Sequence, residues 1–299
     1  MKNESAAGAA FGASAFLIWG LSPLYWKMLQ SIPALEIIMH RIVWSFVFLL
    51  PIVLLQKRGR EMLRVFSEPA TLFMLLCTSL FIALNWLIYI WAVNHGHVLQ
   101  ASLGYYINPL VNVLLGMIFL KEQLRPFQKL AVLLAGAGVL CLTLYYGKFP
   151  WIALTLAFSF GIYGLIRKMA SVGSLTGLTV ETLLLSVPAV IYLGSLKIKH
   201  TGAFLEMGFR TDLFLMGAAL VTALPLLLFT IGTRRLHLST VGFLQYIAPS
   251  CMFLLGIFVY GETFSNIQLL TFCLIWSALI LYSADSLLFY KKNAVRQKA

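Results

Sequence analysis

The sequence repeats itself at half its length. Residues 106–109 read YINP and residues 246–249 read YIAP, and Glu122 and Glu262 follow these tetrapeptides at the same distance. The offset is constant, since 249 − 109 = 262 − 122 = 140. A chain of 299 residues is therefore interpreted as a duplicated unit of roughly 140 residues, with halves at 1–147 and 148–299.

Composition places both halves in a membrane. Hydrophobic residues make up 61% of the chain and charged residues 11%, which is too apolar for a soluble domain. A run of about 20 apolar residues spans a hydrocarbon core of about 30 Å. We expect ten such spans, at 7–29, 34–55, 71–94, 98–120, 127–146, 149–168, 175–196, 211–233, 238–260 and 266–290. Five spans per half is an odd number, so the second half enters from the opposite side and the repeats are inverted.

The positive charges predict the orientation. The formal net charge is +12, and with the N-terminus inside, most basic residues fall on the cytoplasmic side, which favours N-in and C-in. The cytoplasmic set is Lys2, Lys57, Arg58, Arg60, Arg64, Lys121, Arg125, Lys129, Arg167, Lys168, Arg234, Arg235, Lys291, Lys292, Arg296 and Lys298, and the outer set is Lys27, Lys148, Lys197, Lys199 and Arg210. The charge is thus explained by topology, and no nucleic-acid partner is expected.

Neither a metal nor a cofactor is expected. The four cysteines fall inside predicted spans without CxxC spacing and are interpreted as packing residues: Cys77, Cys141, Cys251 and Cys273. His95 and His97 lack a third ligand at a useful spacing. The first apolar run is too long for a secretory leader and is expected to be an uncleaved helix.

Two prolines predict interrupted helices in the middle of the membrane. Pro109 and Pro249 lie near the centres of spans four and nine, where each frees a carbonyl four residues earlier, at Tyr105 and Gln245. Repeat symmetry places the two breaks at one level, facing each other, where a gate or binding site is expected. The alternative is that each proline merely kinks its helix.

Polar and aromatic residues predict a cavity beside these breaks. Tyr105, Asn108 and Asn112 share one face of span four, and Asn85 and Tyr89 share a face of span three. Aromatic faces bind apolar bodies and a few amides fix orientation, which suits a flat amphipathic organic molecule. The remaining candidate substrate contacts are Trp19, Tyr163, Gln245 and Tyr246, whereas Tyr25 and Trp26, near a span end, are interpreted as interfacial residues.

Arg41 and Glu181 are the ionisable residues predicted well inside spans, with His40 beside the first, and they are repeat mates because 181 − 41 = 140. Each costs about 3 kcal/mol at mid-bilayer, so each needs a reason to be there. The spans run in opposite directions, which leaves roughly 12 Å of depth between the two backbones. We therefore expect separate roles, with Arg41 attracting an anionic group or holding a gate and Glu181 carrying a proton. Snorkelling of Arg41 and hydroxyl capping of Glu181 are the alternatives.

The chain resembles the EamA branch of the drug/metabolite transporter superfamily, whose members have ten spans in two inverted five-helix repeats. Residues 16–20 (FLIWG), 23–27 (PLYWK), His40-Arg41 and 94–97 (NHGH) through Asn108-Pro109 resemble, more narrowly, the RarD group of bacterial permeases. The resemblance covers nearly the whole chain. It implies a central cavity between the halves and alternating access by rocking.

The expectation is an all-α permease of the bacterial inner membrane that exports a small organic metabolite or drug. No phosphate-binding loop for ATP is found, so transport is passive or ion-coupled, with a proton as the candidate ion. Its partners are the small-molecule substrate and membrane lipid, and it is a monomer or homodimer. Open alternatives are a lipid-carrier phosphate flippase on the same scaffold, in which Arg41 meets a phosphate, and a non-transporting scaffold with a dry interior. An enzyme is not expected, because no GxSxG or HExxH motif is present.

Overall fold

The computed structural model describes residues 2–94, 98–147, 149–259 and 265–296, and within them the chain forms helices and no strand. In chain order the elements are α1 (Lys2–Trp26), the 3-10 turn η1 (Lys27–Leu29), α2 (Ala34–Leu55), α3 (Gly59–Ser67), α4 (Pro69–Asn94), α5 (Val98–Phe119), α6 (Pro126–Tyr146), α7 (Trp151–Met169), α8 (Ser174–Ile198), α9 (Phe209–Arg235), α10 (Leu238–Gln245), α11 (Ile247–Phe258) and α12 (Asn266–Arg296).

Each predicted span coincides with helix, with ends that differ by a few residues. Within the described residues, nine helical stretches are long and apolar enough to cross a membrane, and the described apolar part of α5, Leu103–Phe119, is shorter. The chain is therefore an all-helical, multi-pass membrane protein. The short helix α3 was not expected. It lies between two spans, buries Val65 and carries three charged residues, Arg60, Glu61 and Arg64.

The prediction of two broken helices is wrong for the first half. Helix α5 continues without interruption past Pro109, whereas the ninth predicted span is divided at Tyr246 into α10 and α11. The hydroxyl of Tyr246 donates to the carbonyl of Tyr106 at 3.3 Å, one residue beyond the carbonyl of Tyr105 that Pro109 frees. Helix α10 packs closely against α5 at Pro109, since a Cβ added at Gly242 would lie 2.6 Å from the carbonyl oxygen of Pro109.

Local sequence determines where the helices begin and end. Helix α6 begins with Pro126, whose missing N–H costs nothing in a first turn, and the backbone N–H of Arg125 is capped by the side chain of Gln128 at 3.0 Å. The helix ends at Gly147, whose φ of 64° is a left-handed conformation that favours glycine. The boundary predicted between the halves, at residue 147, is therefore a true helix end.

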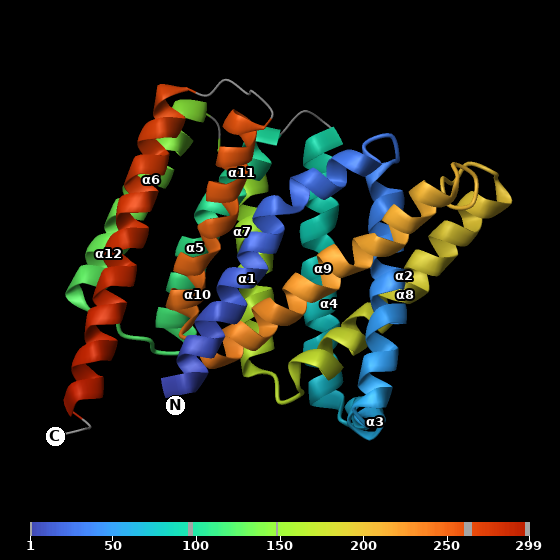
Figure 1. The fold of residues 1–299 in the computed structure, drawn as a ribbon, viewed down its shortest axis with the longest axis horizontal. Helices are drawn as coiled ribbons and strands as arrows, with labels where there is room; N and C mark the ends of the chain where they lie inside the picture. Colours follow the sequence, from blue (N-terminus) through green and yellow to red (C-terminus); the bar gives the residue numbers. More distant parts are fainter. Residues whose placement is uncertain (1, 95–97, 148, 260–264, 297–299) are drawn as a thin grey trace.

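The helices form a bundle in which α1 begins and α12 ends at the same end of the molecule (Figure 1). We call this the terminal end and the opposite one the far end. The connections between α2 and α4, α5 and α6, α7 and α8, and α9 and α10 all lie at the terminal end. These connections and the adjoining helix ends carry basic residues that include Lys57, Arg64, Lys121, Arg125 and Lys168.

Helices of the two halves pack against one another. Helix α1 packs against α9, α4 against α7, α2 against α8, α6 against α12, and α5 against α10 and α7. The crossing of α1 and α9 depends on glycine, because a Cβ at Gly232 would lie 3.1 Å from the backbone nitrogen of Gly12 and 3.2 Å from the carbonyl oxygen of Gly8. The halves are thus interleaved and share one interior.

Candidate functional site

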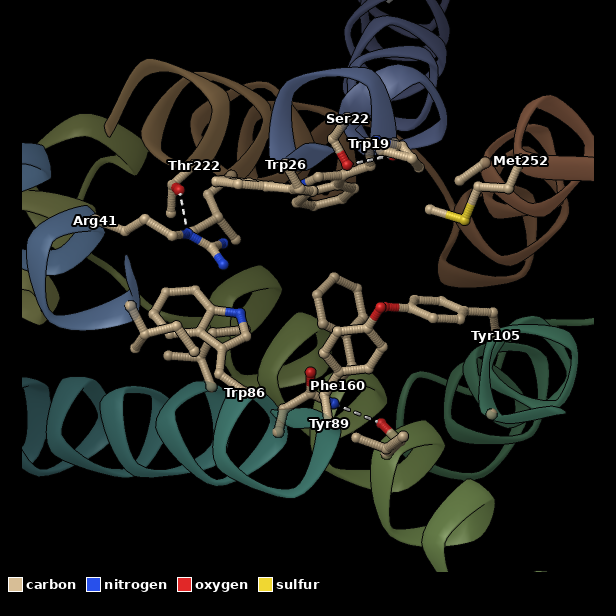
Figure 2. A pocket seen from close by; sticks show the side chains of 18 of the residues that line it. Trp19, Ser22, Trp26, Arg41, Trp86, Tyr89, Tyr105, Phe160, Thr222 and Met252 are labelled. Atoms are coloured by element: carbon tan, nitrogen blue, oxygen red, sulfur yellow. Dashed lines mark hydrogen bonds between the residues drawn. The ribbon is translucent and has the colours of Figure 1, made fainter. Parts of the chain in front are cut away.

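A cavity of about 760 Å³ lies inside the bundle, with walls from α1, α2, α4, α5, α7, α9, α10 and α11. Both halves of the chain contribute to it (Figure 2). Seven predicted site residues line it: Trp19, Arg41, Asn85, Tyr89, Tyr105, Asn108 and Gln245. These seven side chains come from five different helices, which the fold places around one cavity.

The cavity opens toward the far end of the molecule. Its walls include Lys27 and Gln30, which are exposed and follow α1 at that end. On α2, which begins there, the lining residues are confined to the first turns, from Ala34 to Arg41. On α4, which ends there, they lie in the second half, from Ile82 to Tyr89. Among the described residues, those of α1, α2 and α4 that lie closer to the terminal end than Phe16, Arg41 and Ile82 do not line the cavity.

Arg41 supplies a fixed positive charge to the wall. Its guanidinium carbon lies 4.7 Å from the centre of the Trp26 ring and 5.0 Å from that of Trp86, so two indoles flank the charge. Its Nε donates to the hydroxyl of Thr222 at 2.7 Å. Figure 2 shows the remaining guanidinium nitrogens directed into the cavity, between Trp26 and Trp86.

The amides in the wall are bound to the protein itself. Asn85 donates to the carbonyl of Leu156 at 2.9 Å, and Asn108 donates to the carbonyl of Ala157 at 3.1 Å. Asn112 donates to the side-chain oxygens of Asn108 at 3.1 Å and Gln245 at 2.7 Å. This network joins α4, α5, α7 and α10 behind the wall, and it leaves aromatic surface as the main contact for a ligand.

Five aromatic rings close the cavity toward the terminal end. This aromatic floor consists of Phe16, Trp19, Phe160, Tyr163 and Phe229. Neighbouring ring centres are 5.1 to 6.2 Å apart, which is the range for packed aromatic pairs. Tyr163 and Phe229 are 0% and 1% exposed, so no water reaches the lower layer of the floor.

Glu181 lies beneath this floor and is paired with Arg167. The Nε of Arg167 is 3.5 Å from Oε1 of Glu181, and the hydroxyls of Thr78 and Tyr163 donate to the same carboxylate at 2.5 and 3.4 Å. Arg167 was counted among the basic residues of the cytoplasmic side, and the structure shows that its side chain is buried, at 0% exposure, rather than in solvent. A basic residue at the end of an apolar run gives no signal of which way it faces.

A carboxylate also closes the terminal end. Glu122 follows α5, and its oxygens accept hydrogen bonds from the N–H groups of Leu238 at 2.6 Å and Ser239 at 3.0 Å, and from the Ser239 hydroxyl at 2.8 Å. These N–H groups belong to the first turn of α10, which favours a negative charge. His237 Nδ1 lies 3.6 Å from the same carboxylate. We call this contact between the halves the clasp.

The two ionisable residues of the clasp, Glu122 and His237, lie outside the spanning helices, and the pKa of each is shifted. Burial alone would raise the pKa of Glu122, but the interactions with His237, Ser239 and Leu238 outweigh it and lower that pKa to about 2. The carboxylate of Glu122 in turn raises the pKa of His237. The Glu122 carboxylate therefore stays negatively charged throughout the physiological pH range.

The remaining predicted residues lie elsewhere. Asn112 and Tyr246 are fully buried behind the cavity wall, Tyr163 is in the lower layer of the floor, and neither Pro109 nor Pro249 lines the cavity. Glu262, His95 and His97 fall outside the described residues. Sequence reasoning missed Trp86, Phe160 and Thr222, and it assigned Trp26 to the interface although Trp26 lines the cavity. The neighbours of Trp26 in the sequence, Pro23 and Lys27, gave no indication that it lines the cavity. Trp86 follows Asn85, a predicted site residue, and this position could have indicated its role.

Comparisons with known proteins identify the family by sequence and the fold by structure. Residues 6–144 match the model of the EamA-like transporter family. The chain is 49% identical to the "Uncharacterized transporter YojE" of Bacillus subtilis, over 94% of either chain, and 44% identical to the "Protein RarD" of Salmonella typhi, over 97% of this chain and 99% of that one. A protein of known crystal structure superposes with a TM-score of 0.70 over 93% of this chain and 97% of its own, at 19% identity.

Proposed function

Because the chain belongs to the EamA-like transporter family, as a RarD-type permease, we propose that it is a secondary transporter that moves a small organic solute across the bacterial inner membrane by alternating access. The observation that carries this proposal is the cavity, which is open at one end, closed at the other and walled by both halves of the chain. A non-transporting scaffold would need a packed interior instead.

The two halves act as inverted repeats in this proposal. Helix α7 follows α1 by one repeat, and α9 follows α4 by one repeat, so the contact of α1 with α9 has its counterpart in the contact of α4 with α7. Helices α2 and α8 are repeat mates that pack against each other, as are α6 and α12. Such reciprocal packing is expected when a two-fold axis in the membrane plane relates the halves.

Alternating access requires the closed end to open. In the proposal, the aromatic floor and the clasp separate together, because both bridge the two halves: Phe16 and Trp19 meet Phe229, and Glu122 meets the first turn of α10. The far end then closes over Lys27 and Gln30. Because the halves are interleaved, the motion shifts packed helices of the two halves against one another, such as α1 against α9 and α4 against α7.

The orientation follows from the basic residues at the terminal end. With this end in the cytoplasm, as the positive-inside rule favours, both termini are cytoplasmic and the cavity faces outward. This is the state from which an exporter releases its cargo. Glu181 is the proposed proton carrier, although it does not line the cavity, and its protonation requires that the pair with Arg167 separate in the other state.

The test is a metabolite comparison of cells with and without the protein, followed by uptake of the enriched compounds into proteoliposomes under an imposed proton gradient. We expect at least one compound to accumulate with the wild type and not with Arg41→Ala, while Arg210→Ala, which removes an exposed arginine outside the cavity, is unaffected. Glu181→Gln should lose the response to the gradient. Absence of accumulation for every enriched compound would refute the proposal.

A further inference from the structure

The cavity wall has a charge of one sign. Lys27 lies at its rim and Arg41 lies within it, and none of the described residues that line the cavity is an aspartate or a glutamate. In the part of the chain that the structure describes, no carboxylate forms an ion pair with Arg41. A charge held in a low-dielectric interior is costly without a partner, so this site is arranged to receive the partner from outside.

The geometry of Arg41 fits a carboxylate. One edge of the guanidinium is used, because Nε donates to Thr222, and the two indoles restrain its plane from either side. The other nitrogens are directed into the cavity in Figure 2. A guanidinium presented in this way offers two parallel N–H donors, which match the two oxygens of a carboxylate.

The rest of the wall favours a flat apolar body. The rings of Trp19, Tyr89, Tyr105 and Phe160 line the cavity, with Tyr89 and Tyr105 edge to face at 6.0 Å and Trp19 and Phe160 at 5.7 Å. The amide donors of Asn85 and Asn108 are occupied by backbone carbonyls of α7. Stacking and burial therefore supply the affinity outside the charged spot.

The same wall disfavours an ammonium group. An α-amino acid places its ammonium one carbon away from its carboxylate, so binding to Arg41 would bring two positive charges close together in a poorly solvated site. No lining carboxylate of the described residues is there to neutralise the second charge. The wall should therefore bind an organic acid more tightly than the amino acid with the same side chain.

We propose that the cavity selects aromatic organic anions, with the carboxylate on Arg41 and the ring among Trp19, Tyr105 and Phe160. This inference rests on the proposed function and specifies its substrate class. A cavity of about 760 Å³ accommodates such an acid with one or more rings.

Binding to the purified full-length protein, measured by isothermal titration, tests the class with probes that share one ring. Phenylpropionate is the anion, phenylpropionamide the neutral isostere, phenylalanine the zwitterion, phenethylamine the cation and phenyl phosphate the phosphate head group, while hexanoate is an anion without a ring. We expect phenylpropionate to bind at least about tenfold more tightly than every other probe. Tighter or equal binding of any other probe overturns the class, with phenyl phosphate indicating the lipid-carrier alternative. No binding of phenylpropionate up to about 10 mM overturns it as well.

Variants locate the selectivity. Arg41→Gln should weaken phenylpropionate to the level of phenylpropionamide and leave phenylpropionamide unchanged, and Arg41→Lys should keep part of the preference. Arg210→Gln is the matched control, because Arg210 is exposed and lies outside the cavity. An unchanged preference in a folded Arg41→Gln protein overturns the assignment to Arg41. If that variant does not fold, Arg41→Lys and the wild-type probe series decide the question.

Uptake into proteoliposomes separates this inference from the proposed function. Binding and uptake of phenylpropionate support both. Uptake of a competing probe in its place overturns the substrate class and leaves the transporter. Selective binding of phenylpropionate without uptake of any probe leaves the site and overturns transport.

Discussion

Removing the charge of the clasp should open the terminal end. The pKa of Glu122 is lowered from an ordinary 4.5 to about 2, which at about 1.4 kcal/mol per unit corresponds to about 3 kcal/mol in favour of the clasped carboxylate. The variant Glu122→Gln keeps one acceptor oxygen and loses the charge. We therefore expect the population that is open at the terminal end to rise roughly 10- to 100-fold.

Thiol labelling measures this population. Thr230 is fully buried on α9 beside the aromatic floor, so Thr230→Cys, in a protein whose four native cysteines are replaced, is protected until the terminal end opens. An impermeant maleimide added to inside-out vesicles should label it faster in Glu122→Gln by the same factor. In right-side-out vesicles the rate should not rise.

The matched control is Glu206→Gln. Glu206 is an exposed carboxylate that pairs with Lys197 at 2.6 Å in the connection between α8 and α9, at the far end. Its loss should leave the labelling rate unchanged. An increase of less than about threefold in a folded Glu122→Gln protein would refute the argument that the clasp holds this end closed.

Arg167→Met should lower the free energy of unfolding by about 3 to 5 kcal/mol, because it leaves the Glu181 carboxylate buried without its partner. In a detergent melting assay, the double replacement Arg167→Met with Glu181→Met should recover most of this loss. Additive losses would contradict the pairing. Because the pKa of His237 is raised above 6.5, its stabilisation of the clasp is present below about pH 6.5 and is lost as pH rises through the higher folded-state pKa. Labelling of the thiol introduced by Thr230→Cys should therefore accelerate over that interval. His237→Gln should abolish this pH dependence. Gly232→Ala should destabilise the protein by about 1 to 3 kcal/mol because its Cβ would press on the backbone of α1, whereas Gly136→Ala, with open space around it, should not lower the melting temperature.

The positions of the helical spans could be predicted from the sequence because they depend on properties of consecutive residues. A span must be about 20 residues long and apolar, and both properties are read along the chain, so the second span was predicted at 34–55 and α2 occupies Ala34–Leu55. The offset of 140 residues between the halves can likewise be found by matching residues along the sequence. The break in the ninth span was predicted, because Pro249 frees the carbonyl of Gln245, and the helix is divided beside that residue, at Tyr246. The matching Pro109 leaves α5 continuous, so a proline alone does not decide whether a helix is interrupted.

The site was accessible only in part, because the direction of a side chain is a three-dimensional property. Arg41 and Asn108 were identified by their cost in a membrane and by helical spacing, and both line the cavity. Arg167 was missed because a basic residue near a span end is usually at the surface, and only the packing of α7 against its neighbours turns it toward Glu181. The flanking of Arg41 by Trp26 and Trp86 joins three helices and has no signature in any one segment.

The unequal interruption of the two repeat-related helices bears on how the halves deform. Helix α5 is continuous past Pro109, while its counterpart is divided at Tyr246 into two rods of eight and twelve residues. Curvature during a conformational cycle should then concentrate at Tyr246, with α5 swinging as one stiff piece. The two helices are expected to bend unequally between the end states, so a cross-link that joins α10 to α11 should slow the cycle more than one placed within α5.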